Sequence, residues 1–398
     1  MNMLHKKLIS MTAVACMVTP LAANATNGIL PFGNGMVAHG FGGAGIANAS
    51  ETMSGVDNPA LVSNTSEQWT IAGSVFMPYR SADPGSGTYV ESESNFFIVP
   101  QGGYTSNISS TMDYGVLLYA MGGMNTDYPD ASQFNSLLPA TRVGMDLSGL
   151  VIAPTLSFKI DDSSSIGASL LVGYAKLETE GPGVGGFPGN ESDTTTGYGF
   201  KLGYHVKAGE STTIGVIYQS VIDMGEMSFC DSIFAGLKAT GKDCSIDMPD
   251  QYGVGVTHKL NKTWMLVADI LQVNWSNVDV FAHGFAWEDQ TIYKIGAEYD
   301  MGGGNALRFG YNYGKSPIKD SGVGLNLLAP AVTETHYVAG YGMKLDSKSE
   351  LNMYFAYVPE TEQSGTAYQG SPPTPIPGAT ARVKMNQYAL GVGYNVRF

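Results

Sequence analysis

From Glu67 onward, apolar residues alternate with polar or small residues in one segment after another. In residues 166 to 175 the even positions are apolar and the odd positions include glycine, serine and alanine, so one face of the segment is hydrophobic. Residues 198 to 206 and 307 to 313 repeat this pattern. A period of two is typical of β-strands whose two faces meet different surroundings, so we expect an all-β chain.

The length of the segments favours a membrane protein over a soluble sandwich. A sandwich strand usually has about five or six residues, whereas a tilted strand that crosses a bilayer needs about nine to eleven, and most segments here belong to the longer class. Tight turns are predicted at 161–165, 207–211, 260–262, 301–305 and 346–349. Long loops are predicted at 181–192, 225–247, 275–288, 317–333 and 360–381. Short connections at one end and long ones at the other are typical of outer-membrane barrels.

The number of segments gives the size of the barrel. We count about fourteen strands, an even number as bacterial barrels require. Their centres are predicted near residues 73, 98, 116, 154, 171, 201, 217, 254, 268, 295, 309, 340, 354 and 391. The sequence therefore predicts a 14-stranded antiparallel transmembrane β-barrel over residues 67–398.

The end of the chain agrees with this interpretation. In YALGVGYNVRF the alternate residues from Tyr388 to Phe398 are apolar and lie on one face. A terminal aromatic residue on such a strand resembles the signal that outer-membrane barrels present to their assembly machinery. We expect Phe398 to be recognised by that machinery.

Composition also indicates a wall that meets little water. Charged residues make up 14% of the chain, against roughly a quarter in an average soluble protein, and there are 51 glycines and 22 tyrosines. No run of about eighteen apolar residues follows the N-terminus, so the chain has no segment suited to a transmembrane helix.

The first 25 residues read as a secretory signal peptide. Lys6 and Lys7 belong to a positive head, an apolar centre follows, and Ala23-Asn24-Ala25 is a small-x-small cleavage site. A lipoprotein signal at Cys16 is a weaker alternative. Loss of the two lysines changes the net charge from −14 to −16, and an acidic secreted chain argues against nucleic acid as a partner. We expect cleavage after Ala25 and residence in the outer membrane of a Gram-negative bacterium.

Two cysteines remain in the mature chain. Cys230 and Cys244 lie in one predicted loop, and in an oxidising compartment a disulfide is their simplest state. A metal site would need further cysteine or histidine ligands nearby, and the loop has none, so no metal is expected.

The stretch GFGGAG (Gly40 to Gly45) spells the Gly-x-Gly-x-x-Gly pattern of dinucleotide-binding loops. Such a loop needs a strand before it, a helix after it and parallel strands downstream, and the sequence predicts antiparallel hairpins instead. No cofactor is therefore expected. Residues 26–66 are too irregular for a strand and too apolar for water. Because a fourteen-stranded barrel is wider than side chains alone can fill, we expect this segment to be a hatch inside the lumen.

The chain resembles the FadL family of outer-membrane transporters for long-chain fatty acids and aromatic hydrocarbons. The residues that carry the resemblance are GMVAHGFGGAGIANASETMSGVDNPAL, with its Asn58-Pro59-Ala60, and four later segments. Those segments are ADILQVNWS (268–276), WEDQTIYKIGAEY (287–299), LRFGYNYGKSP (307–317) and THYVAGYGMKL (335–345).

The resemblance implies passive uptake of a hydrophobic small molecule. It also implies lateral release into the membrane through a gap where the third strand kinks inward. That strand corresponds to DYGVLLYAMGGM (113–124), in which Gly122-Gly123 would permit a bend. A hairpin turn at this glycine pair is an equal alternative. Fatty acids and hydrocarbons both stay open as substrates, and we expect a monomer in contact with outer-membrane lipid and lipopolysaccharide.

Candidate substrate-binding residues come from the hatch and the third strand. They are Phe32, Met36 and Phe41 in the hatch, and Tyr119, Met121 and Met124 in the strand. Methionine adapts to irregular apolar ligands, although packing of hatch against wall would explain the same residues. If a carboxylate is carried, the inward-facing Lys159, Lys201 or Arg308 could meet it; the alternative is a charge network with Glu298 and Asp269 on the lumen wall.

Other functions have weaker support in the sequence. The six histidines do not cluster and no Gly-x-Ser-x-Gly motif occurs, so we expect no catalytic residues. An outer-membrane enzyme of the barrel phospholipase type is one alternative function. A surface adhesin or phage receptor that acts through its long loops is another. A general porin would be open and hydrophilic, and would not need an apolar hatch.

Overall fold

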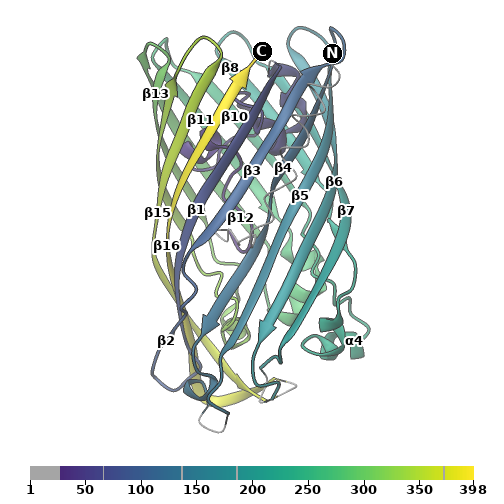
Figure 1. Ribbon diagram of the computed structural model, residues 1–398, viewed down its shortest axis with the longest axis vertical. Coiled ribbons are helices and arrows are strands. Elements are labelled where there is room, and N and C mark those ends of the chain that lie inside the picture. Colours follow the sequence, from purple (N-terminus) through teal and green to yellow (C-terminus); the bar gives the residue numbers. More distant parts are fainter. Residues whose placement is uncertain (1–26, 66, 136–137, 185–186, 371–372) are drawn as a thin grey trace, which may run out of the picture.

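The protein forms a closed barrel in the computed structural model, which describes residues 27–65, 67–135, 138–184, 187–370 and 373–398 (Figure 1). Within these residues one antiparallel sheet has 16 strands, of which β2 (Val90–Glu91) and β9 (Asp223–Met224) are short, so fourteen strands form the ring. They are β1 (Gln68–Asp83), β3 (Phe97–Asn107), β4 (Met112–Tyr128), β5 (Val143–Lys159), β6 (Ser164–Glu180), β7 (Glu191–Lys207), β8 (Thr212–Gln219), β10 (Gln251–Lys259), β11 (Trp264–Val273), β12 (Gln290–Gly302), β13 (Asn305–Gly314), β14 (Thr335–Lys344), β15 (Ser349–Gln369) and β16 (Thr374–Arg397).

Pairing of the last strand with the first closes the ring. Gln68 of β1 lies opposite Arg397 of β16, and the register continues to Asp83 opposite Arg382. Closure of this kind removes both sheet edges, which a chain in lipid requires because no water is present to bind free backbone groups. The predicted 14-stranded barrel is confirmed, and each predicted strand centre falls within one of the fourteen strands.

One predicted loop is wrong. The stretch 360–381 is mostly strand, because β15 continues to Gln369 and β16 begins at Thr374. Prolines and small polar residues interrupt the apolar alternation there and give it the composition of a loop. The two strands nevertheless pair with each other beyond the rest of the wall, with register shifts at Val358/Thr361 and Thr366/Tyr368.

The two faces of the strands differ as the period of two predicts. On β6, Ile166 and Leu170 are 45% and 52% exposed, whereas Leu171 and Ala175, at odd-numbered positions on the other face, are buried. The exposed outer residues of the wall are large and apolar on strand after strand, including Tyr198, Phe200, Leu202 and Tyr204 of β7. An outward apolar band of this kind is the lipid-facing surface of a membrane barrel.

The connections at the two ends of the barrel differ in length. Tight turns and the C-terminus lie at the end drawn at the top of Figure 1, and the loop with α4 (Ala235–Ala239) lies at the other end. The longer loops contain η2 (Ala131–Gln133), η3 (Ser228–Asp231), η4 (Trp275–Asn277), η5 (Val280–Gly284) and η6 (Asp320–Leu325). A disulfide joins Cys230 to Cys244 across the loop of η3 and α4, with their Cα atoms 5.4 Å apart. Among the described residues no helix is long and apolar enough to span a bilayer.

Hydrogen bonds join two of the long loops to each other. Trp287 Nε1 donates to Asn326 Oδ1 at 2.8 Å, and the Asn326 amide donates to the carbonyls of Phe285 and Gly322 at 2.7 and 2.8 Å. One buried side chain thus holds the loop of η5 against the loop of η6.

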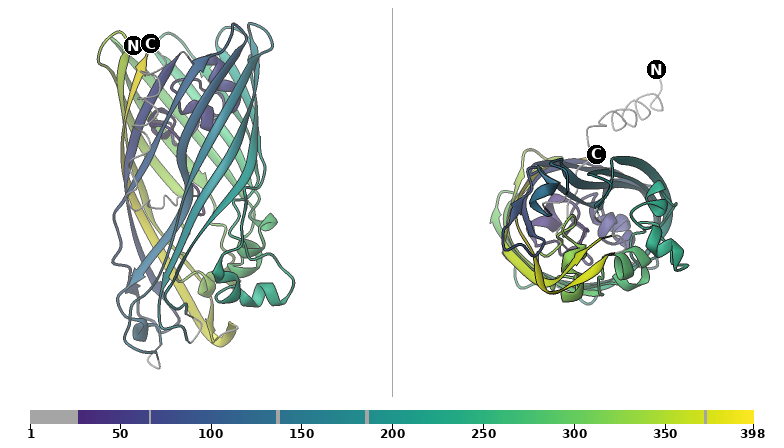
Figure 2. Two further views of the ribbon diagram at one scale, coloured as in Figure 1. Left: turned by 45° about the vertical axis from the view of Figure 1, so that its right-hand side comes forward. Right: turned by 90° about the horizontal axis from the view of Figure 1, so that it is seen from below.

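The hatch, residues 27–65 of the described chain, lies inside the ring (Figure 2). It contains α2 (Met36–Gly40), α3 (Ser54–Asp57) and η1 (Pro59–Asn64). Gly42 and Gly43 of GFGGAG have φ of +69° and +85°, and a Cβ on Gly42 would lie 2.8 Å from the backbone of Tyr311 in β13. These glycines therefore let the hatch backbone turn and pack against the wall. Residues 1–26, including the predicted signal peptide, lie outside the described residues.

Candidate functional site

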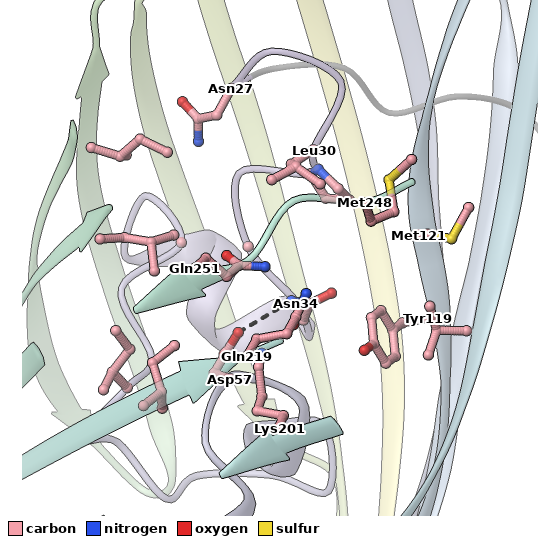
Figure 3. A pocket seen from close by; sticks show the side chains of 18 of the residues that line it. Asn27, Leu30, Asn34, Asp57, Tyr119, Met121, Lys201, Gln219, Met248 and Gln251 are labelled. Carbon is pink, nitrogen blue, oxygen red and sulfur yellow. Dashed lines mark hydrogen bonds between the residues drawn. The ribbon is translucent and has the colours of Figure 1, made fainter. Parts of the chain in front are cut away.

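A cavity of ≈ 750 Å³, partly open to solvent, lies between the hatch and the wall (Figure 3). Its apolar lining residues are Leu30, Pro31, Ile46, Tyr119, Ala120, Met121, Val151, Ile217, Ile222, Met248, Leu271 and Ile292. Its polar lining residues include Asn27, Asn34, Asp57, Lys201, Gln219, Gln251, Asp269 and Lys294. We call this space the main cavity. The main cavity therefore presents both hydrophobic and polar side chains to a ligand.

The strand that supplies Tyr119 and Met121 is irregular at this point. The register between β4 and β5 shifts between Ala120 and Gly122, so Met121 forms a β-bulge. Gly122 has φ +142°, and a Cβ there would lie 2.6 Å from the Ile29 carbonyl oxygen of the hatch. The Gly123 amide donates to that same oxygen at 3.0 Å. Because β4 continues to Tyr128, the alternative that the glycine pair forms a hairpin turn is wrong.

The same stretch of β4 is not paired with β3. Pairing of β3 with β4 runs from Asn107 opposite Asp113 to Gly102 opposite Leu118 and then stops. Beyond that point β3 still pairs with β1 and β4 still pairs with β5. In the part of the chain that the structure describes, backbone bonding between these segments resumes where the Glu93 amide donates to the Asp127 carbonyl at 2.8 Å. We call the interval between these points the β3–β4 gap; the side chains of Tyr119, Met121 and Met124 are buried there.

Asn58, Pro59 and Ala60 anchor the hatch to the opposite side of the wall. The Asn58 amide donates to the carbonyls of Ile46 and Tyr204 at 2.8 and 3.0 Å, and Asn58 Oδ1 accepts from the Ala60 amide at 3.0 Å. The Ala60 carbonyl accepts from the hydroxyls of Ser157 and Ser165, each at 3.0 Å. The motif thus joins the hatch to β5, β6 and β7.

Charged side chains of the wall bind the hatch backbone. Lys201 Nζ donates to the Val56 carbonyl at 2.8 Å and Lys294 Nζ to the Gly43 carbonyl at 3.1 Å. Asp269 Oδ2 accepts from the amides of Gly45 and Ile46 at 2.7 and 3.1 Å. These groups line the main cavity as well as holding the hatch, so a ligand there would meet charges that already have partners.

Asp57 adds a carboxyl to this group from the hatch itself. Its Oδ1 accepts from the Asn34 amide at 3.2 Å. Burial raises the pKa of the Asp57 carboxyl, while the nearby Lys294 and Lys201 act in the opposite direction. Two lysines therefore share this end of the cavity with two acidic residues, Asp57 and Asp269, and the polar end is close to charge balance.

A second, smaller cavity of ≈ 320 Å³ lies beside the β3–β4 gap. Its lining residues are Phe76, Arg80, Phe97, Met124, Asn125, Ala329, Pro330, Ala331 and Met385. We call it the gap cavity. It differs from the main cavity because one cation, Arg80, is set among mostly apolar side chains.

The predicted binding residues are distributed over different parts of the molecule. Tyr119, Met121 and Lys201 line the main cavity, and Met124 lines the gap cavity. Three hatch residues, Phe32, Met36 and Phe41, are buried in the packing of hatch against wall and line neither cavity.

Two of the predicted cations have other roles in the structure. Arg308 donates to Glu298 at 2.7 Å and to Asn352 at 2.8 Å, and it lies over the ring of Phe41. Arg308 and Glu298 thus form the ion pair of the alternative network. Lys159 is the last residue of β5, 3.9 Å from Asp113 at the short-turn end, and lines neither cavity.

Several lining residues carry no distinctive signal in the sequence. Lys294, Gln219 and Gln251 occupy inward positions of ordinary alternating strands, and Arg80 does the same on β1. The alternation identifies such positions as inward-facing, but it does not say which of them face a cavity. Asp57 was detectable only as the neighbour of Asn58.

Comparison with known proteins gives the family. Residues 41–398 match the family described as outer membrane protein transport protein (OMPP1/FadL/TodX). Among curated proteins, none matches the chain in sequence.

Solved structures share the fold. The P. putida toluene transporter TodX superimposes with a TM-score of 0.72 at 17% identity, covering 92% of this chain and 99% of TodX. A Pseudomonas aeruginosa FadL homologue gives 0.69 at 14% identity, covering 94% and 100%. The Ralstonia pickettii toluene transporter TbuX gives 0.67 at 17% identity, covering 92% and 99%. With the family match over most of the chain, the chain belongs to the OMPP1/FadL/TodX family of outer-membrane transport proteins, which are channels and not enzymes.

Proposed function

We propose that this protein takes up hydrophobic small molecules, long-chain fatty acids or related hydrocarbons, and releases them sideways into the membrane through the β3–β4 gap. The observation that carries the proposal is the position of the gap. Tyr119 and Met121 line the main cavity on one side, and they belong to the stretch of β4 that has no β3 partner. A ligand in the cavity would therefore have only side chains, and no backbone ladder, between itself and lipid.

The relatives support the class of substrate. TodX and TbuX are toluene transporters, and the fold is shared with a FadL homologue. Burial of apolar surface contributes roughly 25 cal/mol per Å², so an oily molecule can be captured without an energy source. The methionines of the lining, Met121 and Met248, suit ligands of irregular shape.

We also propose a location for the protein in the cell. The signal peptide would be removed after Ala25 and the barrel inserted in the outer membrane of a Gram-negative bacterium, with its long loops among lipopolysaccharide. Phe398, which is 64% exposed at the end of β16, would be read by the assembly machinery, and the barrel would act as a monomer.

The test is to straighten β4 at the bulge. We expect Gly122→Val/Gly123→Val to slow uptake of toluene and of dodecanoate several-fold in proteoliposomes, because valine disfavours φ +142° and would collide with the Ile29 carbonyl. The matched control is Gly73→Val, on β1, where the nearest atom to a new Cβ is 3.6 Å away. Both barrels should keep the heat-dependent gel mobility of folded barrels.

Two results would overturn the proposal. Unchanged uptake in the double variant would show that release does not pass the gap. Rapid swelling of wild-type liposomes in sugars would show an open porin instead of a plugged transporter.

A further inference from the structure

The edge of β4 that faces the β3–β4 gap is bonded by other parts of the molecule in place of β3. Backbone groups of alternate residues point to the same edge of a strand, and on β4 these residues are Gly123, Asn125 and Asp127. The Gly123 amide donates to the Ile29 carbonyl of the hatch, and the Asn125 carbonyl accepts from the Arg80 guanidinium. Free backbone groups are costly within lipid, so these replacements keep the edge of β4 satisfied.

Arg80 spans the place that β3 leaves. In the sheet, β3 lies between β1 and β4, and the pairing of β1 with β3 ends at Phe76. Arg80, farther along β1, donates directly to the Asn125 carbonyl and so joins β1 to β4. Its Nη2 atom also donates to Ser92 Oγ and Asn95 Oδ1, both at 3.3 Å, in the segment between β2 and β3. One side chain thus connects β1, β4 and this segment around the gap.

Ser92 completes the connection at the long-loop end of the gap. Its amide donates to the Arg80 carbonyl at 2.9 Å, and its hydroxyl accepts from the Asp127 amide at 3.0 Å. Farther out, Arg142 joins Glu93 to Asp127, but its side chain is 39% exposed and surface ion pairs contribute little. The bonds of Arg80 and Ser92, together with the backbone bond of Glu93, therefore close this end of the gap.

The surroundings of Arg80 suit a link between wall segments. The residue is 4% exposed and its guanidinium lies 5.6 Å from the centre of the Phe97 ring, so its bonds are shielded from water and strengthened. The carboxylates of Asp127 and Asp146 act electrostatically on Arg80, so its charge is compensated within the wall. An arginine presents its donors as a planar fork, which allows simultaneous bonds to groups on different segments.

We propose that Arg80 is a strap that holds the β3–β4 gap closed and limits the width of the molecules that leave through it. The inference rests on the proposed function, in which ligands pass this gap. Side-chain bonds break and re-form individually, whereas a strand ladder would have to separate along its length. For a ligand to pass, the guanidinium leaves the Asn125 carbonyl and the segment 92–96 moves away from β4.

The experiment measures initial uptake of toluene, dodecanoate and the wider molecule mesitylene in a Gram-negative host that lacks transporters of this family. Wild type is compared with Arg80→Met, which keeps a long side chain and removes its donors. We expect Arg80→Met to speed mesitylene uptake about tenfold and uptake of the two narrower molecules less, because the closed gap loses hydrogen bonds from a charged group. Purified Arg80→Met barrels should still exclude sugars in liposome swelling, since the hatch and not the strap seals the lumen.

Two further variants sharpen the result. Ser92→Ala removes one acceptor of the strap and keeps Arg80, so it should speed mesitylene uptake about twofold even if Arg80→Met fails to fold. Arg382→Met is the matched control, because Arg382 lies on β16 opposite Asp83, on the other side of β1 from the gap. Uptake should not change in this control.

The outcomes separate the strap from the proposed function. Unchanged or slower mesitylene uptake in folded Arg80→Met, or in Ser92→Ala if Arg80→Met does not fold, would overturn the strap, and so would equal acceleration of all three molecules. Entry of sugars would also overturn it, because the substitution would then have loosened the whole barrel. If uptake were unchanged in Gly122→Val/Gly123→Val as well, the proposed function itself would fail, whereas slower uptake in that variant alone would leave the function intact and remove only the strap.

Discussion

The two ends of the hatch are held in different ways. At the C-terminal end, Asn58 and Ala60 form a set of buried hydrogen bonds to three strands. At the N-terminal end, the turn from Asn27 to Leu30 accepts a bond from the Gly123 amide at the Ile29 carbonyl and packs against the rings of Trp275 and Trp287. Directional polar bonds fix one end, whereas mostly apolar packing holds the other.

This difference places the apolar attachment beside the proposed transport route. Asn27 and Leu30 line the main cavity, and Ile29 contacts β4 at the bulge that borders the gap. A ligand that pushed against the turn would act on the bond between Gly123 and Ile29 and on the ring contacts, without disturbing the Asn58 anchor. Four predictions test this contrast.

The largest effect should come from breaking the anchor. Asn58→Ala removes three hydrogen bonds and leaves buried groups without partners, which should cost about 4 kcal/mol of hatch attachment. We expect the variant barrel to admit sugars in liposome swelling and to lose the hatch to protease. Asn34→Ala, which removes one 3.2 Å bond to Asp57, is the control and should leak little. A sugar-tight Asn58→Ala barrel would contradict the role of the anchor.

Acid should loosen the hatch through His39. This residue is buried, stacks on Tyr354 with ring centres 4.4 Å apart, and has its Nδ1 2.5 Å from the Gly35 carbonyl oxygen. Burial lowers the pKa of His39 to about 4. The pKa of histidine in the unfolded chain is higher, 6.5, so neutral His39 makes its full contribution to hatch attachment above pH 6.5. This contribution, about 3 kcal/mol, is lost as the pH drops toward 4.

The measurement is protease release of the hatch between pH 7 and 4, in wild type and in His39→Asn. Burial also raises the pKa of Glu51, so protonation of Glu51 at low pH strengthens hatch attachment and opposes the effect of His39. The difference between the two pH profiles therefore isolates the contribution of His39. Identical profiles for wild type and His39→Asn would rule out a contribution from His39.

A smaller effect is expected at the N-terminal turn. Gly28 has φ +64°, and a Cβ there would lie 2.5 Å from Trp275 Cζ2, so Gly28→Ala should displace the turn at about 1 to 2 kcal/mol. Tryptophan fluorescence should shift as Trp275 and Trp287 lose this contact, while sugar permeability stays low. Gly236→Ala, where no atom lies within 4 Å, is the control. A leaking Gly28→Ala barrel would mean that the turn, and not only Asn58, seals the lumen.

The smallest effect is expected at the disulfide. Cys230→Ser with Cys244→Ser should expose the loop to trypsin at Lys238 and Lys242, because both lysines lie between the two cysteines. Uptake should stay within about twofold of wild type, since the disulfide lies outside both cavities and a disulfide acts on the loop it closes. Loss of uptake would show that this loop is part of the access route.

The sequence predicted the wall better than the site. Alternation with period two is a local signal, so each strand centre could be located from its own residues. The loop at 360–381 was mispredicted because strand pairing there overrides a composition typical of loops. Lys159 and Lys201 look alike in sequence, yet one is at the short-turn end and the other at the main cavity.

The sequence by itself determined a fourteen-stranded barrel with an apolar outer face and an N-terminal segment suited to its lumen, because strand period and glycine content are properties of short stretches. Only the tertiary structure decided where β3 and β4 separate and that Met121 forms a bulge. The physical reason is that pairing, burial and charge compensation depend on residues far apart in the chain, and no local pattern records which of them meet.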